Sequence, residues 1–265
     1  MRKLFPTELV FQVFSLLFAF IVVHAIYVAV VRPNAEAFIA EETARLAQDR
    51  TAEPRRSAFV VIKDYEQEAC FVLMLWAMSI LGYKAVTTYR QQRHLDLDLV
   101  GLPADARVTR ETTRQTSEMI RLRLPEKMQD YLLPRVLLSA IDRFSSTGSI
   151  QDASNVVESL CETEGDRRES ELSIIRYIAW AIPSIGFIGT VRGIGDALAQ
   201  AHRAVEGDIT GVTASLGVAF NSTFIALMIS IVLMFVIHQI QLMQERLVLD
   251  TRRYCDDWLI RRLRT

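Results

Sequence analysis

Hydroxyl side chains recur on one face of each of the last two apolar stretches of the chain. In the stretch from Val212 to Gln239, small residues follow one another at steps of three and four, which places them on one face of a helix. They are Ser215, Ala219, Ser222, Thr223, Ala226 and Ser230. A second face carries bulky residues at similar steps: Phe220, Phe224, Leu227, Ile231 and Phe235. Small residues let membrane helices approach closely, so we expect the first face to meet protein or water and the second to meet lipid.

The preceding stretch, Ile174 to Ala199, carries a matching ladder of small residues. Its members are Gly186, Gly189, Thr190, Gly193 and Ala197. Pro183 lies one turn below the ladder and is expected to kink the helix. We therefore assign helix packing to a set of residues from both stretches: Pro183, Gly186, Gly189, Gly193, Ala219 and Ala226.

Thr190 and Thr223 lie at matched depth. At about 1.5 Å per helical residue, each lies a similar distance outward of the centre of its stretch. The short segment 200–211 makes the two helices antiparallel neighbours, so both hydroxyls can lie at one level. With Ser222 beside them, they could line a membrane-buried ion path. The alternative is that each hydroxyl only bonds the carbonyl four residues earlier in its own helix.

No acidic residue lies at mid-depth in either stretch. Arg192 and Asp196 are near the outer end of 174–199, where an interfacial or inter-subunit ion pair is the plain explanation. Because a proton or sodium path normally needs a titratable carboxylate, this chain carries half of a site. The other half is expected to come from another polypeptide.

Four apolar stretches long enough to span a bilayer position these residues. The run from Leu9 to Val31 contains no formal charge, and a span needs about 20 predominantly apolar residues. The sequence thus predicts an all-α fold with four transmembrane helices and long cytoplasmic helical extensions. The segments are 1–31 with the first span, 32–68 as an outer loop, 69–89 as the second span, 90–173 as a cytoplasmic helical region, 174–199 as the third span, 200–211 as an outer turn, 212–240 as the fourth span and 241–265 as a cytoplasmic C-terminal helix.

Positive charge sets the orientation. Arg2 and Lys3 precede the first span, and further arginines flank 90–173 and fill the C-terminal segment. The positive-inside rule therefore places both termini in the cytoplasm of a multi-pass protein in the lipid bilayer.

Enzymatic and metal chemistry find little support in the sequence. Three scattered cysteines form no Cys-x-x-Cys pair, and the four histidines are isolated. We expect no metal site, no cofactor, no enzymatic activity and no nucleic-acid partner.

Two stretches carry a resemblance to a known family. Residues 181–195, AIPSIGFIGTVRGIG, resemble the Pro-x-x-Gly-x-x-Gly-Thr-Val-x-Gly span of the MotA/TolQ/ExbB proton channel family, and residues 216–227, LGVAFNSTFIAL, are similar to its final span. Four spans resemble MotA, whereas the Gly-Thr-Val motif resembles TolQ and ExbB. Val218 departs from the pattern, because ExbB-like members carry a glutamate there.

The resemblance implies a motor subunit of the bacterial inner membrane. Five copies would surround a dimer of a single-span partner of the MotB, TolR or ExbD type, whose membrane aspartate carries the ion. Thr190 and Thr223, with Ser222 beside them, match positions that would line the ion route. Proton or sodium flow would then drive rotation. The alternative is a structural membrane scaffold subunit that conducts no ions.

Overall fold

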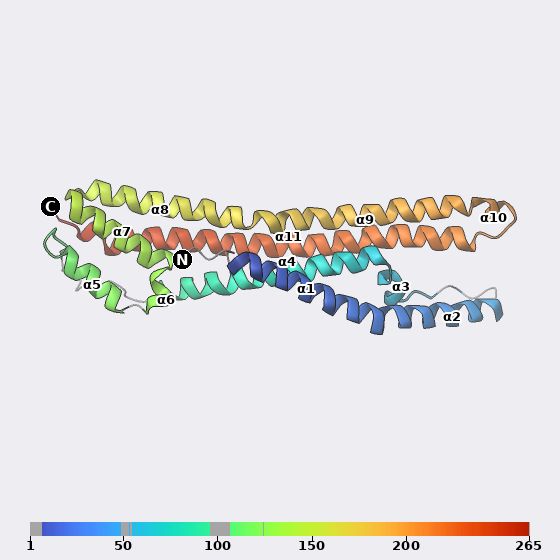
Figure 1. Ribbon diagram of the computed structural model, residues 1–265. Helices are drawn as coiled ribbons and strands as arrows, with labels where there is room; N and C mark the ends of the chain where they lie inside the picture. The colour runs from blue at the N-terminus through green and yellow to red at the C-terminus, as the bar shows by residue number, and fades with distance from the viewer. Residues whose placement is uncertain (1–6, 49–52, 54, 96–106, 124, 265) are drawn as a thin grey trace. The chain divides into compact units, whose positions relative to one another are not determined.

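The structure is a computed structural model that describes residues 7–48, 53, 55–95, 107–123 and 125–264. Arg2 and Lys3, on which part of the predicted orientation rests, lie outside the described residues. Figure 1 shows the helices, which are α1 (Thr7–Ile26), the π-helical η1 (Tyr27–Val31), α2 (Arg32–Gln48), α3 (Ala58–Ile62), α4 (Tyr65–His94), α5 (Thr113–Arg123), α6 (Glu126–Gln129), α7 (Leu132–Thr147), α8 (Ile150–Glu171), α9 (Ser173–Ala199), α10 (Ala201–Val205), α11 (Thr210–Trp258) and the short η2 (Ile260–Arg262). Within the described residues, the only β-type pairing is an isolated bridge between Val108 and Leu263.

Within the part of the chain that the structure describes, four long helices are apolar enough to cross a membrane, as the sequence predicts. They are Leu9–Gln48, Tyr65–His94, Ile150–Ala199 and Thr210–Arg262. The first continues from α1 through η1 into α2 without a break, so it extends well past residue 31. Helix α11 has 49 residues, more than twice the roughly 20 that a bilayer requires. This excess length agrees with the expected helical extensions.

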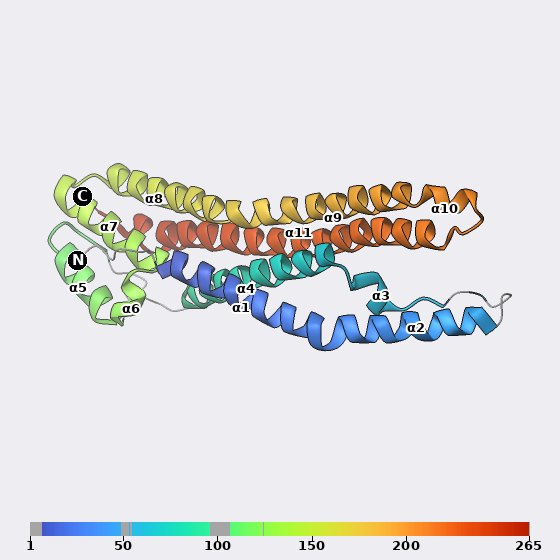
Figure 2. The same ribbon diagram turned by 45° about the vertical axis from the view of Figure 1, so that its right-hand side comes forward.

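The chain divides into two compact units. Unit 1 comprises Met1–Gly82 and Ile174–Ile237, and unit 2 comprises Tyr83–Ser173 and His238–Thr265. In unit 1, α9 and α11 lie side by side in both ribbon views (Figures 1 and 2).

Asp208 precedes α11 and accepts a hydrogen bond from the Thr210 N–H at 3.1 Å. The Thr210 hydroxyl, together with this N–H, holds the pKa of the Asp208 carboxyl below its usual value.

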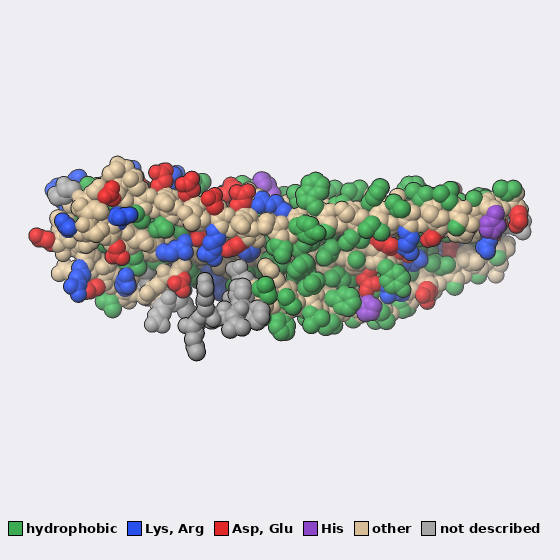
Figure 3. All heavy atoms as spheres, turned by 45° about the horizontal axis from the view of Figure 1, so that its top comes forward, with side chains coloured by type: hydrophobic (Ala, Val, Ile, Leu, Met, Phe, Trp, Pro, Cys, Tyr) green, Lys and Arg blue, Asp and Glu red, His purple; other side chains and the backbone are tan. Residues whose placement is uncertain are grey.

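Helix α11 sorts its residues by size in the way that the sequence predicts. Phe220 and Ile231 are 68% and 66% exposed, whereas Ala219 and Ala226 are fully buried. On the face shown in Figure 3, hydrophobic side chains cover much of unit 1, and a small group of charged and histidine side chains interrupts them. The exposed stripe is the surface that lipid or another subunit would cover.

The first helix packs on α4 within unit 1. Val23, Tyr27 and Val31 form a buried cluster with Val72 of α4. Farther along the same pair, the Trp76 indole N–H donates to the Gln12 carbonyl at 2.9 Å. Burial of an apolar stripe and this hydrogen bond therefore contribute to holding the two helices together.

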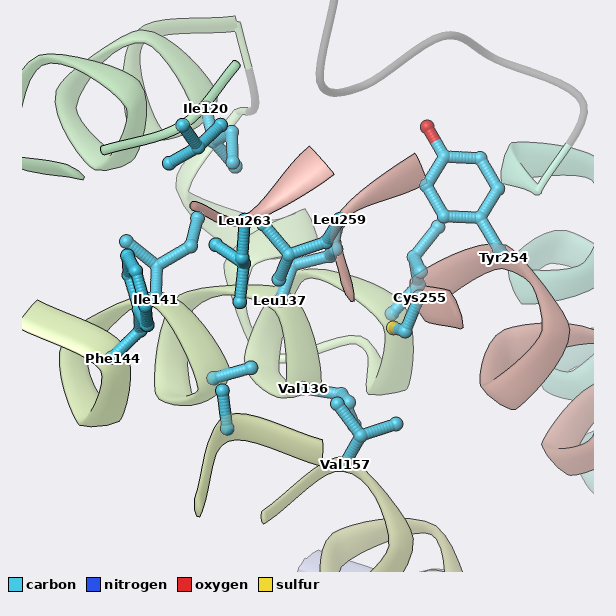
Figure 4. Packing of buried hydrophobic residues seen from close by; sticks show 14 of the residues in the cluster. Ile120, Val136, Leu137, Ile141, Phe144, Val157, Tyr254, Cys255, Leu259 and Leu263 are labelled. Carbon is cyan, nitrogen blue, oxygen red and sulfur yellow. The ribbon is translucent and has the colours of Figure 1, made fainter. Parts of the chain in front are cut away.

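Unit 2 has its own apolar core (Figure 4). Leu137, Ile141 and Phe144 of α7 pack there against Val157 of α8 and Leu259 near the end of the chain. The apolar residues of α7 recur at helical spacing and lie on its buried face. Two adjacent residues form the corner between α7 and α8: Gly148 ends α7 with a φ of 70°, and the Ser149 hydroxyl accepts from the Asp152 N–H to begin α8.

Buried ion pairs connect the helices of unit 2. The Lys84 ammonium is 8% exposed and lies 2.8 Å from the Glu171 carboxylate. The Arg168 guanidinium, also buried, pairs at 3.0 Å with Glu164 of its own helix α8, and Glu164 in turn pairs with Arg135 of α7 at 2.7 Å. Lys84 therefore has its ion-pair partner inside the protein.

Candidate functional site

Close approach of α9 and α11 builds the site, and glycine makes this approach possible. A Cβ atom added to Gly193 would lie 2.7 Å from the Ser215 carbonyl oxygen and 2.8 Å from the Ala219 Cβ. One added to Gly189 would lie 2.5 Å from the Ser222 Cβ. Distances this short are not compatible with a side chain, so the two helices meet backbone to backbone along this ladder.

The same ladder continues one turn farther along α9. A Cβ atom on Gly186 would overlap that of Ala226 and would lie 3.1 Å from the Ser222 carbonyl oxygen. The structure thus brings together the glycines and alanines to which the sequence assigns helix packing.

Thr190 and Thr223 meet at this contact. Their hydroxyl oxygens are hydrogen bonded to each other. The Thr190 hydroxyl also lies 3.1 Å from the Ala219 carbonyl oxygen of α11, and the Thr223 hydroxyl lies 3.1 Å from the Gly186 carbonyl oxygen of α9. Both side chains are half-buried. The depth count from the sequence correctly places the two hydroxyls at one level.

The bonding is reciprocal between the helices. Gly186 and Ala219 are the residues four positions before Thr190 and Thr223, and their carbonyls are the acceptors within a single helix. Thr190 still lies 3.3 Å from its own acceptor, but each carbonyl is also approached by the threonine of the opposite helix. The alternative in which each hydroxyl bonds only its own helix does not describe this arrangement.

Ser222 has surroundings different from those of the threonines. It is 1% exposed, and its hydroxyl accepts a hydrogen bond from the Gln67 amide of α4 at 3.4 Å. Gln67 is fully buried, and its amide oxygen accepts from the Asp64 N–H at 2.8 Å. Within one chain, Ser222 therefore faces α4, whereas Thr223 faces Thr190.

Pro183 leaves a backbone carbonyl of α9 without its helical donor, and α11 supplies a replacement that the sequence alone does not indicate. Proline has no N–H, so it leaves the carbonyl four residues earlier, that of Ala179, without its helical donor. The Ser230 hydroxyl of α11 lies 3.1 Å from this carbonyl and donates to it. Helix α9 continues through Pro183 as one helix, and the orphaned acceptor becomes a contact between α9 and α11.

The first turn of α4 adds charged groups that the sequence analysis placed in the outer loop. Glu66 pairs with Arg192 of α9 at 2.7 Å. Glu68 is 7% exposed and bonds Arg32, and its other oxygen lies 2.7 Å from the His24 ring nitrogen. The partner of Arg192 therefore comes from α4 of the same chain.

Glu66 lies close to the glycine ladder of α9. The Cβ position at Gly189 lies 3.2 Å from the Glu66 Cγ and 2.7 Å from the Ser222 hydroxyl oxygen. Three consecutive residues of α4 thus contact three helices: Glu66 contacts α9, Gln67 contacts α11 and Glu68 contacts the first helix. Among the described residues, no group of three or more His, Cys, Asp or Glu side chains lies in a metal-binding arrangement.

A protein family model matches the part of the chain that contains the threonine pair. The sequence model of the MotA/TolQ/ExbB proton channel family matches residues 128–253, which include α9, most of α11 and both threonines. The resemblance identified at residues 181–195 and 216–227 is thereby confirmed. Neither curated proteins nor solved structures gave a significant match.

Proposed function

Because the chain belongs through residues 128–253 to the MotA/TolQ/ExbB proton channel family, we propose that it is the channel-forming subunit of an ion-driven membrane motor. Five copies surround a dimer of a single-span partner that supplies a membrane aspartate, in a bacterial inner membrane with both termini cytoplasmic. Flow of protons or sodium ions down their gradient then drives movement of the subunits about the partner. The observation that carries this proposal is the Thr190–Thr223 hydroxyl pair at the close contact of α9 and α11.

The count of donors and acceptors supports a role of this pair in an ion path. Each hydroxyl donates one hydrogen bond, yet three acceptors are within reach: the Ala219 carbonyl, the Gly186 carbonyl and the other hydroxyl. When both protons point to carbonyls, both hydroxyl oxygens keep a lone pair for an outside donor. A protonated carboxyl, a water molecule or a sodium ion can then be accepted without breaking the helix contact.

The missing carboxylate supports a partner. Neither α9 nor α11 places an Asp or Glu beside the threonine pair, and the nearby Glu66 is paired with Arg192. A partner's aspartate completes a site in which the hydroxyls accept the ion and the carboxylate carries it. Scaffold function, the alternative, uses the same small faces only for packing.

Threonine variants separate the two functions. We propose measuring internal acidification of right-side-out vesicles from the native host membrane, loaded with the pH dye pyranine, after an external acid pulse under a potassium diffusion potential. A parallel assay uses a sodium-sensitive dye. Thr190→Val and Thr223→Val keep the side-chain shape and remove the hydroxyl, so we expect loss of ion entry. Thr190→Ser and Thr223→Ser keep the hydroxyl and should retain it.

Ion entry that survives both valine variants, with protein amounts equal to wild type, would refute the channel proposal and favour the scaffold. Mass spectrometry of the complex purified in mild detergent tests the assembly. We expect a single-span partner with a membrane aspartate at a ratio of five to two.

A further inference from the structure

Arg192 puts a positive charge on the α4 side of α9, a short distance along the helix from the threonine pair. It follows Thr190 by two residues, which is a rise of about 3 Å and a turn of about 200°, so the two side chains leave the helix on different sides. Its side chain is 42% exposed, whereas that of its partner Glu66 is only 12% exposed. The charge of this pair therefore acts on the threonines through space, and the carboxylate that neutralises the guanidinium comes from α4.

We infer that the Glu66–Arg192 pair sets the charge at the outer mouth of the ion path, so that its balance controls how fast cations reach Thr190 and Thr223. This inference rests on the proposed function. A fixed positive charge beside a narrow polar path repels cations, and a fixed negative charge concentrates them. With both present at 2.7 Å, the two fields largely cancel at the threonines.

Among the acidic residues near Arg192, Glu66 is the one that pairs with its guanidinium. Glu68 is engaged by Arg32 and His24 on the side of the first helix. Asp196, one turn beyond Arg192 on α9, is exposed, whereas the Arg192 guanidinium pairs with Glu66. Removal of the Glu66 charge thus leaves the Arg192 charge uncompensated, and removal of the Arg192 charge leaves the Glu66 charge uncompensated.

The two single variants should act in opposite directions. In the vesicle assay, Glu66→Gln leaves the positive charge and should slow cation entry roughly tenfold, whereas Arg192→Gln leaves the carboxylate and should accelerate it several-fold, by about the same electrostatic factor. The double variant Glu66→Gln/Arg192→Gln has no net field and should return entry to within about threefold of wild type. High salt should reduce both single effects.

Structural damage gives a different pattern. If the pair only holds α4 against α9, both single variants lower ion entry and the double variant does not recover. Glu158→Gln is the matched control, because it removes the carboxylate of an exposed ion pair with Arg252 in unit 2, and its entry rate should stay at wild type. Protein amount and thermal unfolding midpoint are measured for every variant.

Two outcomes overturn the inference separately from the proposed function. Entry that requires the threonine hydroxyls but changes in the same direction in both single variants refutes the charge balance alone. Wild-type vesicles without threonine-dependent entry refute the proposed function and the inference with it.

Discussion

The backbone contact at Gly193 gives the sharpest test of how α9 and α11 are held. A methyl group there would lie 2.7 Å from the Ser215 carbonyl oxygen and 2.8 Å from the Ala219 amide nitrogen. Normal carbon contacts need about 3.5 Å or more, so the helices must separate by several tenths of an ångström to about 1 Å. Backbone atoms cannot rotate away, and we expect Gly193→Ala to destabilise the helix pair by about 1–3 kcal/mol through overpacking.

Gly195 in the same helix is the matched control. A Cβ atom there has nothing within 4 Å. Both changes gain the same intrinsic helix propensity, about 1 kcal/mol for glycine to alanine, so the difference between the two variants isolates the steric cost. Unfolding by SDS titration in mixed micelles, followed by circular dichroism, measures that difference. Equal stability of Gly193→Ala and Gly195→Ala would refute close backbone packing.

Three further predictions concern other parts of the chain. Ser230→Ala should cost about 1 kcal/mol because the Ala179 carbonyl loses its donor, and the cost should vanish in a Pro183→Ala background, where the restored N–H serves that carbonyl; a double-mutant cycle measures this. Lys84→Met removes the buried partner of Glu171 and leaves it only the exposed Arg167, so it should destabilise the protein by on the order of 1–3 kcal/mol in the same SDS titration. The three thiols are buried and free: Cys70, Cys161 and Cys255. They should react with maleimide only after unfolding, as read by mass spectrometry.

The sequence predicts the α9 and α11 pair well because its signals are local. Size sorting at helical steps defines the packed face, and a count of residues from the centre of each span places Thr190 level with Thr223. The predicted third span, 174–199, differs from α9 by one residue at its start. Each of these inferences needs only the residues within one helix or the short turn that joins two.

The contacts of α4 could not be predicted in this way. Glu66 and Glu68 are charged, so hydropathy assigns them to the loop before the second span, whereas the helix begins at Tyr65. Their partners lie far away in the chain: Arg192 is 126 residues from Glu66, and Arg32 is 36 residues from Glu68. A single sequence carries no signal that pairs them. Acidic residues in the first turn stabilise a helix, and this preference is the one local signal for a helix that begins at Tyr65.

Helical geometry explains why three adjacent residues reach three helices. Successive side chains are about 100° apart around a helix, so Glu66, Gln67 and Glu68 together cover most of its circumference. Such a polar turn is tolerable in an apolar unit only where each side has a partner, and here those partners are Arg192, Ser222 and Arg32.

These contacts connect α4 to the part of the chain that matches the family model, residues 128–253. Arg192 and Ser222 lie within the family match at residues 128–253, whereas the α4 turn that bonds them lies outside it. Exchange of α1 to α4 for unrelated spans would therefore keep the threonine pair but leave Arg192 without its counter-ion. In this protein, α4 thus does more than anchor the chain, because it supplies the carboxylate that pairs with Arg192 of α9.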